Sequence, residues 1–170
     1  DPHCTSSLDD TEGGILDLDN DTIPDYRDEC PMTRPNLTQY VNYYGCPRPI
    51  ATKFGRTFHF ERLKGLKRVM FENLNGQVEF NNETISMVGR NGTRLDVDSG
   101  LKIERSRLLM NLSQLSVPAN ITFYNVDVQE PRILRDGVDC VDCRIIDWNR
   151  PRLKFEVPHF TTYEVIEGYT

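Results

Sequence analysis

The 170-residue sequence predicts an all-β protein, an antiparallel β-sandwich of Ig-like or jelly-roll-like type that follows an irregular acidic segment. From about residue 50, short runs alternate apolar and polar residues, turn signals separate these runs, and no long helical pattern occurs. Residues 1–31 are rich in Asp and poor in large apolar side chains, so they cannot form a core alone. We therefore expect two parts, residues 1–49 and residues 50–170.

Each expected strand is marked by period-two alternation, which buries one face and leaves the other wet. The alternating apolar residues are, in chain order, Phe58 and Phe60, Val69 and Phe71, Val78 and Phe80, Ile85 and Met87, Leu95 and Val97, Leu101 and Ile103, Ile121 and Phe123, and Leu153, Phe155 and Val157. Turns are expected, from their Gly, Asn, Asp and Pro residues, at Asn75-Gly76, Asn91-Gly92, Ser99-Gly100, Asp136-Gly137 and Asn149-Arg150-Pro151.

Two segments complete the expected architecture. Leu108, Leu112 and Leu115 have helical spacing, which predicts at most a short turn of helix within residues 107–116. The run from Phe160 to Ile166 alternates like a strand near the end of the sequence, so we expect an edge or closing strand there. An edge strand leaves N–H and C=O groups free to pair with another chain.

The negative charge lies at the start of the chain. The formal net charge is −6, yet residues 1–31 hold ten acidic side chains against one basic side chain, a net charge of −9, and the rest holds 16 acids and 19 bases, a net charge of +3. Overall acidity argues against nucleic acid as a partner, because its phosphates require clustered Lys and Arg. No apolar run approaches the roughly 20 residues that a membrane span needs, so no span is expected.

Carboxylates recur at regular positions after residue 16. Counting Asp17 as position 1, they fall at positions 1, 3, 5, 9 and 12, and the Ile23 carbonyl falls at position 7. A twelve-residue calcium loop supplies oxygen ligands at this spacing, whereas magnesium demands stricter octahedral geometry. The alternative, a solvated acidic linker, has no reason to reproduce ligand spacing. The pattern predicts a calcium-binding segment with the ligands Asp17, Asp19, Asp21, Ile23, Asp25 and Asp28.

The same stretch, closed by Cys30-Pro31, resembles a thrombospondin type 3 repeat. Similar repeats form linkers in OmpA-family surface proteins, where a second Cys-Pro follows, as Cys46-Pro47 does here. The resemblance covers residue 9 to about residue 47. It implies that the five aspartates hold calcium, and it suggests a disulfide between Cys30 and Cys46.

Two details of this resemblance bear on the site. Thr22 stands where the family usually has Gly, so the turn after Asp21 requires strain or another geometry. Upstream, Asp10-Thr-Glu12-Gly-Gly14 resembles a truncated preceding repeat, which makes Asp10 and Glu12 the candidate ligands of a second ion.

Residues 117–168 resemble β-domains that are repeated in secreted archaeal surface proteins. The stretches that carry this resemblance are Ala119-Asn-Ile-Thr-Phe-Tyr-Asn125, Pro131-Arg-Ile-Leu-Arg-Asp-Gly137, the pair Cys140 and Cys143, and His159-Phe-Thr-Thr-Tyr163. The resemblance implies a surface β-sandwich and no known chemistry.

The pair Cys140-Val-Asp-Cys143 is open to three readings: a redox site, a zinc half-site or a small structural disulfide. Zinc usually requires a second Cys or His pair at matching spacing, and a redox motif would precede a helix, so we favour the structural disulfide. Cys4 is then unpaired or bound to another chain, unless it pairs with Cys30 in place of Cys46.

Several features favour export from the cell. Disulfides form in oxidising compartments, and we expect a secretory signal to have been removed before Asp1. Sequons for N-glycosylation occur at Asn36, Asn82, Asn91, Asn111 and Asn120. An extracellular or cell-surface location is therefore expected.

No constellation of catalytic residues is recognisable, so an enzyme is not expected. The histidines are His3, His59 and His159; His59 is expected on the wet face of a strand and His159 in a loop. The sequence contains no Gly-x-Ser-x-Gly, His-Glu-x-x-His, phosphate-loop or dinucleotide motif. Trp148 could stack on a sugar ring, but a strand Trp more often packs.

Together these observations predict a secreted, N-glycosylated, calcium-binding structural protein, a subunit of an extracellular filament or cell-surface layer. Its partners would be identical subunits in a head-to-tail homopolymer, with the N-terminal segment of one subunit lying against the β-domain of the next. The alternative is an adhesin or carbohydrate-binding module, which would recognise cell-surface glycans through exposed aromatic side chains on one sandwich face.

Overall fold

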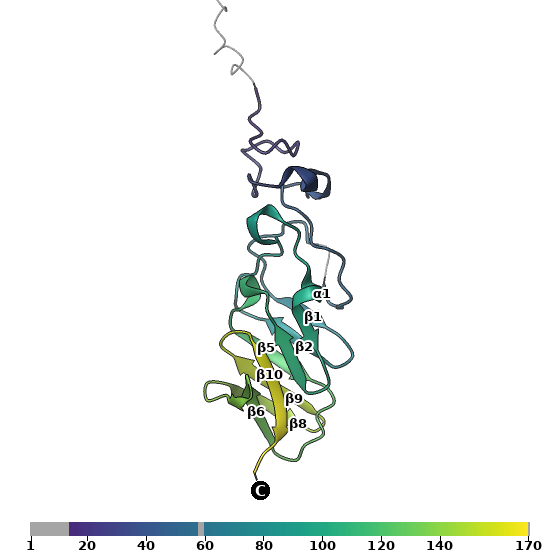
Figure 1. Cartoon of the computed structure of the whole chain (residues 1–170), viewed down its shortest axis with the longest axis vertical. Coiled ribbons are helices and arrows are strands. Elements are labelled where there is room, and N and C mark those ends of the chain that lie inside the picture. Colours follow the sequence, from purple (N-terminus) through teal and green to yellow (C-terminus); the bar gives the residue numbers. More distant parts are fainter. Residues whose placement is uncertain (1–13, 58–59, 170) are drawn as a thin grey trace, which may run out of the picture.

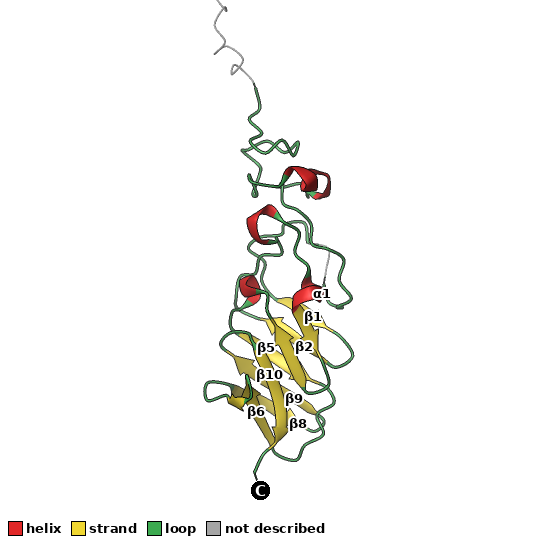
Figure 2. Ribbon diagram, viewed as in Figure 1, coloured by secondary structure: helices red, strands yellow, loops and turns green. Residues whose placement is uncertain are grey.

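The computed structural model describes residues 14–57 and 60–169. These residues form an elongated molecule with the β-sheets at one end and irregular chain toward the N-terminal end, as Figure 1 and Figure 2 show. Within the described residues, no helix is long and apolar enough to cross a membrane.

The strands form two five-stranded antiparallel sheets. The first sheet runs in the order β1 (Val69–Glu72), β2 (Gly76–Phe80), β5 (Ala119–Phe123), β9 (Arg152–Val157) and β8 (Arg144–Asn149). The second runs in the order β3 (Leu101–Ile103), β4 (Arg107–Met110), β10 (Thr162–Glu167), β6 (Pro131–Arg135) and β7 (Val138–Asp139). The predicted all-β fold with an antiparallel β-sandwich is thus confirmed.

Helical structure in the described residues is short. The α-helix α1 spans Val97–Gly100, and the 3-10 helices are η2 (Pro35–Tyr40), η3 (Arg90–Gly92) and η4 (Ser113–Leu115). Asp96 caps α1, because its carboxylate accepts a hydrogen bond from the backbone N–H of Ser99 at 3.2 Å. This cap converts the strand expected around Leu95 and Val97 into a helical turn, so that prediction was wrong.

The core lies between the two sheets and follows the period-two pattern of the sequence. β2 and β9 alternate buried and partly buried or exposed residues along their lengths. Phe155 is central to this core: its ring centroid lies 5.8 Å from that of Phe123 in its own sheet and 6.3 Å from that of Tyr163 in the other. Aromatic pairs at such distances add to the burial of apolar area that stabilises the sandwich.

Other expected elements differ from the prediction in instructive ways. Ile85 makes only an isolated bridge to Leu66, so no strand forms around it. Residues 107–116 divide into strand β4 and the 3-10 helix η4, because Leu108 pairs with Tyr163 of β10. Phe60 is not in a strand, and its expected partners Phe58 and His59 lie outside the described residues.

The C-terminal strand β10 is central, not at an edge. It pairs with β4 on one side and with β6 on the other, so its backbone groups are already bonded within the sheet. The edge strands are β1 and β8 in the first sheet and β3 and β7 in the second. The expectation that residues 160–166 form an edge strand was therefore wrong, because strand order depends on pairing between segments far apart in the sequence.

The N-terminal segment is attached to the sandwich by polar contacts. Asn42 donates its side-chain N–H to the carbonyl of Glu61 at 3.0 Å, and Glu29 forms an ion pair with Arg62 at 3.0 Å. Lys64 also donates to the carbonyl of Glu29, at 2.6 Å. These contacts hold the acidic loop at one end of the sandwich.

Candidate metal centre

The loop that carries the predicted ligands closes on itself through its own backbone. Asp25 donates its backbone N–H to the carbonyl of Leu16 at 2.8 Å, and the Asp25 carboxylate accepts from the N–H of Leu18 at 2.8 Å. Thr22 has φ 76°, a conformation that is rare for a β-branched residue. The turn after Asp21 therefore takes the strained geometry that Thr in place of Gly requires.

Three aspartates converge inside this loop. Carboxylate oxygens of Asp17, Asp19 and Asp21 all lie within 4.8 Å of one another. The backbone N–H of Asp21 donates to the carboxylates of Asp17 and Asp19, at 3.2 Å each, so the chain wraps its own amides around the group. Three negative charges this close repel one another unless a cation lies between them.

Asp21 is the most buried of these residues, with 1% of its surface exposed. Its Oδ1 accepts a hydrogen bond from the backbone N–H of Ile23 at 2.7 Å, but its Oδ2 is buried and has no partner. Asp28 repeats the arrangement: Oδ1 accepts from the N–H of Cys30 at 2.7 Å, and Oδ2 is buried without a partner. Unpartnered buried oxygens are rare in proteins and call for a ligand or ion.

Gly45 brings these two carboxylates together. A Cβ at Gly45 would lie 2.6 Å from Cγ of Asp28 and 3.1 Å from Oδ2 of Asp21, so both side chains occupy the space that glycine leaves free. Gly45 has φ 76°, a conformation that glycine adopts without strain. Gly45 is not among the residues predicted from the sequence, although it directly precedes Cys46.

The electrostatics of the centre favour neutralisation. Burial, helped by the nearby carboxylates of Asp19, Asp28 and Asp17 and opposed by the hydrogen bond from the Ile23 N–H, raises the pKa of Asp21 from 3.8 to about 6. Burial also raises the pKa of Asp28, with the same kind of support from Asp19, Asp25 and Asp17. A proton or a metal ion is therefore needed to stabilise this cluster.

The predicted ligand set is only partly assembled. Asp17, Asp19 and Asp21 form one cluster, and Asp28 lies beside Asp21 at Gly45. The Oδ1 of Asp25 accepts a hydrogen bond from the backbone N–H of Leu18, and the backbone N–H of Ile23 donates to Oδ1 of Asp21. The candidate ligands of a second ion, Asp10 and Glu12, lie outside the described residues.

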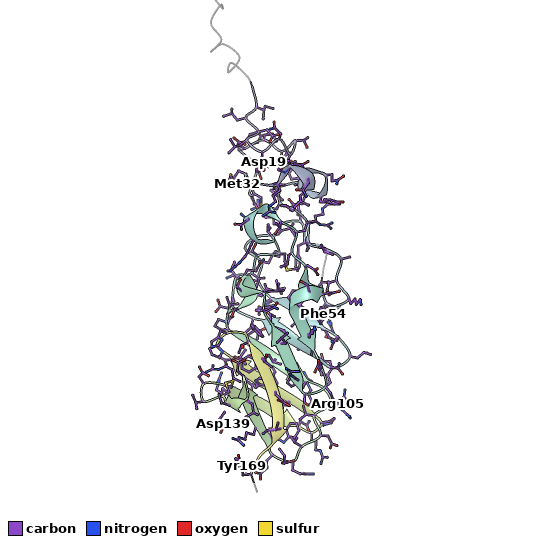
Figure 3. All side chains as sticks on the ribbon, viewed as in Figure 1. Asp19, Met32, Phe54, Arg105, Asp139 and Tyr169 are labelled. Carbon is purple, nitrogen blue, oxygen red and sulfur yellow. A yellow bond between two sulfur atoms is a disulfide. The ribbon has the colours of Figure 1, made fainter. Side chains whose placement is uncertain are left out.

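The loop is braced from behind by a disulfide between Cys30 and Cys46, which confirms the expected pairing. Between these cysteines, the Thr33 hydroxyl donates to the carbonyls of Cys30 and Gly45, at 3.1 and 3.0 Å, and the Thr33 N–H donates to Asp19 at 2.8 Å. Thr33 is buried and is not among the residues predicted from the sequence. The disulfide and the Thr33 hydrogen bonds hold the carboxylate cluster in place. The labelled residues Asp19 and Met32 show where this part of the chain lies in Figure 3.

A second acidic and sulfur-containing group, Cys140, Asp142 and Cys143, lies between β7 and β8. Here the two sulfur atoms form a disulfide, which confirms the structural reading of this motif. Metal binding by cysteine requires free thiolates, so this group is not a thiolate site while the disulfide is closed. Cys4 lies outside the described residues.

The sequons lie mainly on the surface. Asn36, Asn82, Asn91 and Asn111 are exposed, and Asn120 is half-buried in the central strand β5. The first four offer their side chains to modification without any change in the fold.

The histidines and Trp148, which were considered as catalytic or sugar-binding groups, are accounted for by contacts within the fold where the structure describes them. His159 lies in the loop before β10, with its Nε2 3.4 Å from Arg135. Trp148 packs against the core at the edge of the first sheet and donates its indole N–H to the carbonyl of Gln129 at 3.2 Å. His3 and His59 lie outside the described residues.

Comparison with known proteins adds no assignment, since no family model, no curated protein and no solved structure matches the chain. The support for a metal centre is therefore the arrangement of the carboxylates themselves.

Proposed function

We propose that this protein is a secreted, N-glycosylated structural protein that binds calcium through its N-terminal segment and assembles into an extracellular filament or surface layer. Calcium would be held by Asp17, Asp19, Asp21 and Asp28, with Asp25 and the Ile23 carbonyl completing an oxygen-only set. This composition suits calcium, which accepts many oxygen ligands in flexible geometry.

The observation that carries this proposal is the pair of buried carboxylate oxygens without partners. Oδ2 of Asp21 and Oδ2 of Asp28 are buried without a partner, and both carboxylates lie beside Gly45, with Asp21 also in the cluster formed with Asp17 and Asp19. An unpaired buried charge costs several kcal/mol. A divalent cation removes that cost, and it also compensates the repulsion within the cluster.

The structural role is supported by shape and compartment. The molecule is elongated (Figure 1). The N-terminal segment that would bind calcium has no large apolar core of its own. Binding an ion would therefore stiffen this segment into a rigid extension of the sandwich. Two disulfides and four exposed sequons fit an oxidising, extracellular location. A stiffened extension with a β-domain behind it is suited to join one subunit to the next.

Calorimetric titration of the metal-free protein with calcium tests the site. Replacing both Asp19 and Asp21 by Ala should abolish binding, because two charged ligands are lost from a site built on several. Asp147→Asn, an exposed carboxylate on β8, is the matched control and should leave binding unchanged. Unchanged calcium affinity in the double variant would show that the ion binds elsewhere.

Light scattering with calcium and with a chelator tests the assembly. Wild-type protein should form large particles in calcium, and removing residues 1–31 should leave a folded monomer. A full-length, calcium-loaded and glycosylated protein that stays monomeric at high concentration would contradict the filament proposal.

The adhesin or carbohydrate-binding alternative has less support. It requires exposed aromatic side chains on one face of the sandwich, yet Trp148 is partly buried there. The exposed tyrosines Tyr40 and Tyr43 belong to the N-terminal segment, where Arg94 and Arg27 stack on their rings. Arg132 likewise stacks on the exposed Tyr169, whereas the exposed Tyr26 belongs to the N-terminal segment and not to a sandwich face.

A further inference from the structure

A groove separates the connector, here residues 48–52, from the end of the sandwich. This junction groove has a volume of about 660 Å³ and lies between residues 48–52 and the chain around α1. Its floor is apolar and includes the buried side chains of Leu63, Met87 and Val97. Arg48 and Arg94 stand among its lining residues. An apolar floor with basic groups beside it fits a ligand that is both apolar and acidic.

The chain around the groove is strongly basic. Residues 48–68 hold seven basic side chains against one acidic side chain, Glu61, a net charge of +6. Arg48 and Lys53 are exposed, and neither side chain forms an ion pair with a carboxylate in the part of the chain that the structure describes. The acidic group beside them is Asp98, whose carboxylate accepts the backbone N–H of Lys53 at 3.0 Å and the hydroxyl of Thr52. Their charges are therefore available to a partner.

Arg94 is held in place without losing its charge. Its guanidinium donates to the carbonyls of Arg48 and Pro49, at 2.9 and 3.3 Å, and its Cζ lies 4.3 Å from the centre of the Tyr40 ring. Carbonyls and an aromatic face orient a guanidinium but do not neutralise it. Arg94 is thus a fixed positive group beside the apolar floor.

The first 18 residues of the chain have the complementary character. They contain five acidic side chains and no Lys or Arg, a net charge of −5. They also contain Leu8, Ile15, Leu16 and Leu18. Of these, Ile15, Leu16 and Leu18 are 66%, 71% and 68% exposed in the described chain, although the loop backbone is hydrogen-bonded at Leu16 and Leu18. Apolar side chains held outward beside carboxylates form a docking surface without a partner in the monomer.

We propose that the junction groove receives residues 1–18 of a second copy of this chain, with Leu side chains on the apolar floor and carboxylates facing Arg48, Lys53 and Arg94. This inference rests on the proposed function, since it supplies the head-to-tail contact of the filament. Charge complementarity selects the partner and its orientation.

Geometry favours a second copy over the chain's own N-terminal segment. The described chain begins at the end of the molecule farthest from the sandwich, and α1 lies beside the sheets (Figure 1). The groove is lined by Val97 of α1, so it lies at the sandwich end of the N-terminal segment. Residues 1–13, fully extended, reach at most about 45 Å, enough to cross to a neighbouring molecule. Because the donor and acceptor surfaces differ, each copy both gives and receives a segment, and the contact propagates.

A charge swap in the full-length, calcium-loaded protein tests this contact. The groove variant carries Arg48→Glu and Lys53→Glu, and the leader variant carries Asp1→Lys and Asp9→Lys. The control carries Arg107→Glu and Arg152→Glu, two exposed basic residues on β4 and β9 outside the groove, and changes the net charge equally. Association is measured by light scattering and sedimentation, and calcium binding by calorimetry on every variant.

Each swapped variant alone should associate at least about tenfold more weakly than wild type, because like charges then meet at the contact. The control should assemble as wild type does, and all variants should bind calcium equally. An equimolar mixture of the groove and leader variants should assemble again, since each restores the opposite charge for the other.

The remaining outcomes overturn the inference in distinguishable ways. If wild type assembles but the groove variant assembles equally well, or if the mixture stays monomeric, this contact is wrong and the filament function stands. If wild type binds calcium yet never assembles, the filament function fails and the contact with it. If a short DNA duplex binds the groove of wild type while the groove variant still assembles, the basic surface serves nucleic acid and not this chain.

Discussion

Replacing Gly45 by Ala is the sharpest test of the calcium site. At φ 76°, an Ala costs about 1–2 kcal/mol of backbone strain, partly offset by about 0.4–1 kcal/mol from the less flexible unfolded chain. The new Cβ would lie 2.6 Å from Cγ of Asp28 and 3.1 Å from Oδ2 of Asp21, so the Asp28 carboxylate must move. Displacing one charged ligand should weaken calcium binding at least tenfold, about 1.4 kcal/mol.

Gly65→Ala is the matched control for this experiment. Gly65 has φ 67°, but its new Cβ would have no atom within 4 Å, so it carries the backbone cost without the clash. Calcium titration by calorimetry and urea unfolding, with and without chelator, separate the two effects. Without metal, Gly65→Ala should lose about 1 kcal/mol of stability from backbone strain, and Gly45→Ala should lose more because its Cβ also displaces Asp28. Only Gly45→Ala should lose calcium affinity. Equal affinity in both variants would refute the placement of Asp28 in the site.

Three further predictions concern the same loop. In the presence of a chelator, the free energy of unfolding should fall by at most about 3 kcal/mol as the pH rises from about 4 to about 6. The reason is that the folded state raises the pKa of Asp21 from 3.8 to about 6 and so binds its proton more tightly than the unfolded state does. Urea unfolding of Asp21→Asn should show a smaller dependence on pH. Thr22→Gly should raise the free energy of unfolding by up to about 1 kcal/mol, and the melting temperature with it, because it relieves the backbone strain at φ 76°. Calcium binding should not weaken. Replacing Cys30 and Cys46 by Ser should cost about 3 kcal/mol in urea unfolding and weaken calcium binding, whereas opening the second disulfide should leave calcium affinity unchanged.

Local patterns predicted the strands well where neighbours along the chain decide the structure. Alternation placed β2 and β9 because each buries one face of the same sheet. Asp136-Gly137 forms the turn between β6 and β7, where both residues have positive φ. β8 was not predicted from alternation, because as an edge strand it is exposed or partly exposed along its whole length.

The candidate metal centre was predicted in part. Regular spacing identified the five aspartates, since each lies within a single short stretch of chain. Spacing did not separate Asp25, whose carboxylate accepts from the Leu18 N–H, from the clustered Asp17, Asp19 and Asp21. Local hydrogen bonds, which the residue types alone do not determine, made that distinction.

By itself, the sequence determined the β class and the acidic loop, because these depend on periodicity and charge spacing. The resemblance to a thrombospondin type 3 repeat suggested the disulfide that closes the loop, and the sequence left Cys4 as another possible partner of Cys30. The tertiary structure decided what depends on distant segments: the central position of β10 between β4 and β6, and the approach of Gly45 to Asp21 and Asp28. It also brought the connector against the chain around α1 to form the junction groove. Such contacts follow from strand order and packing, because groups far apart in the sequence meet only when the whole core forms.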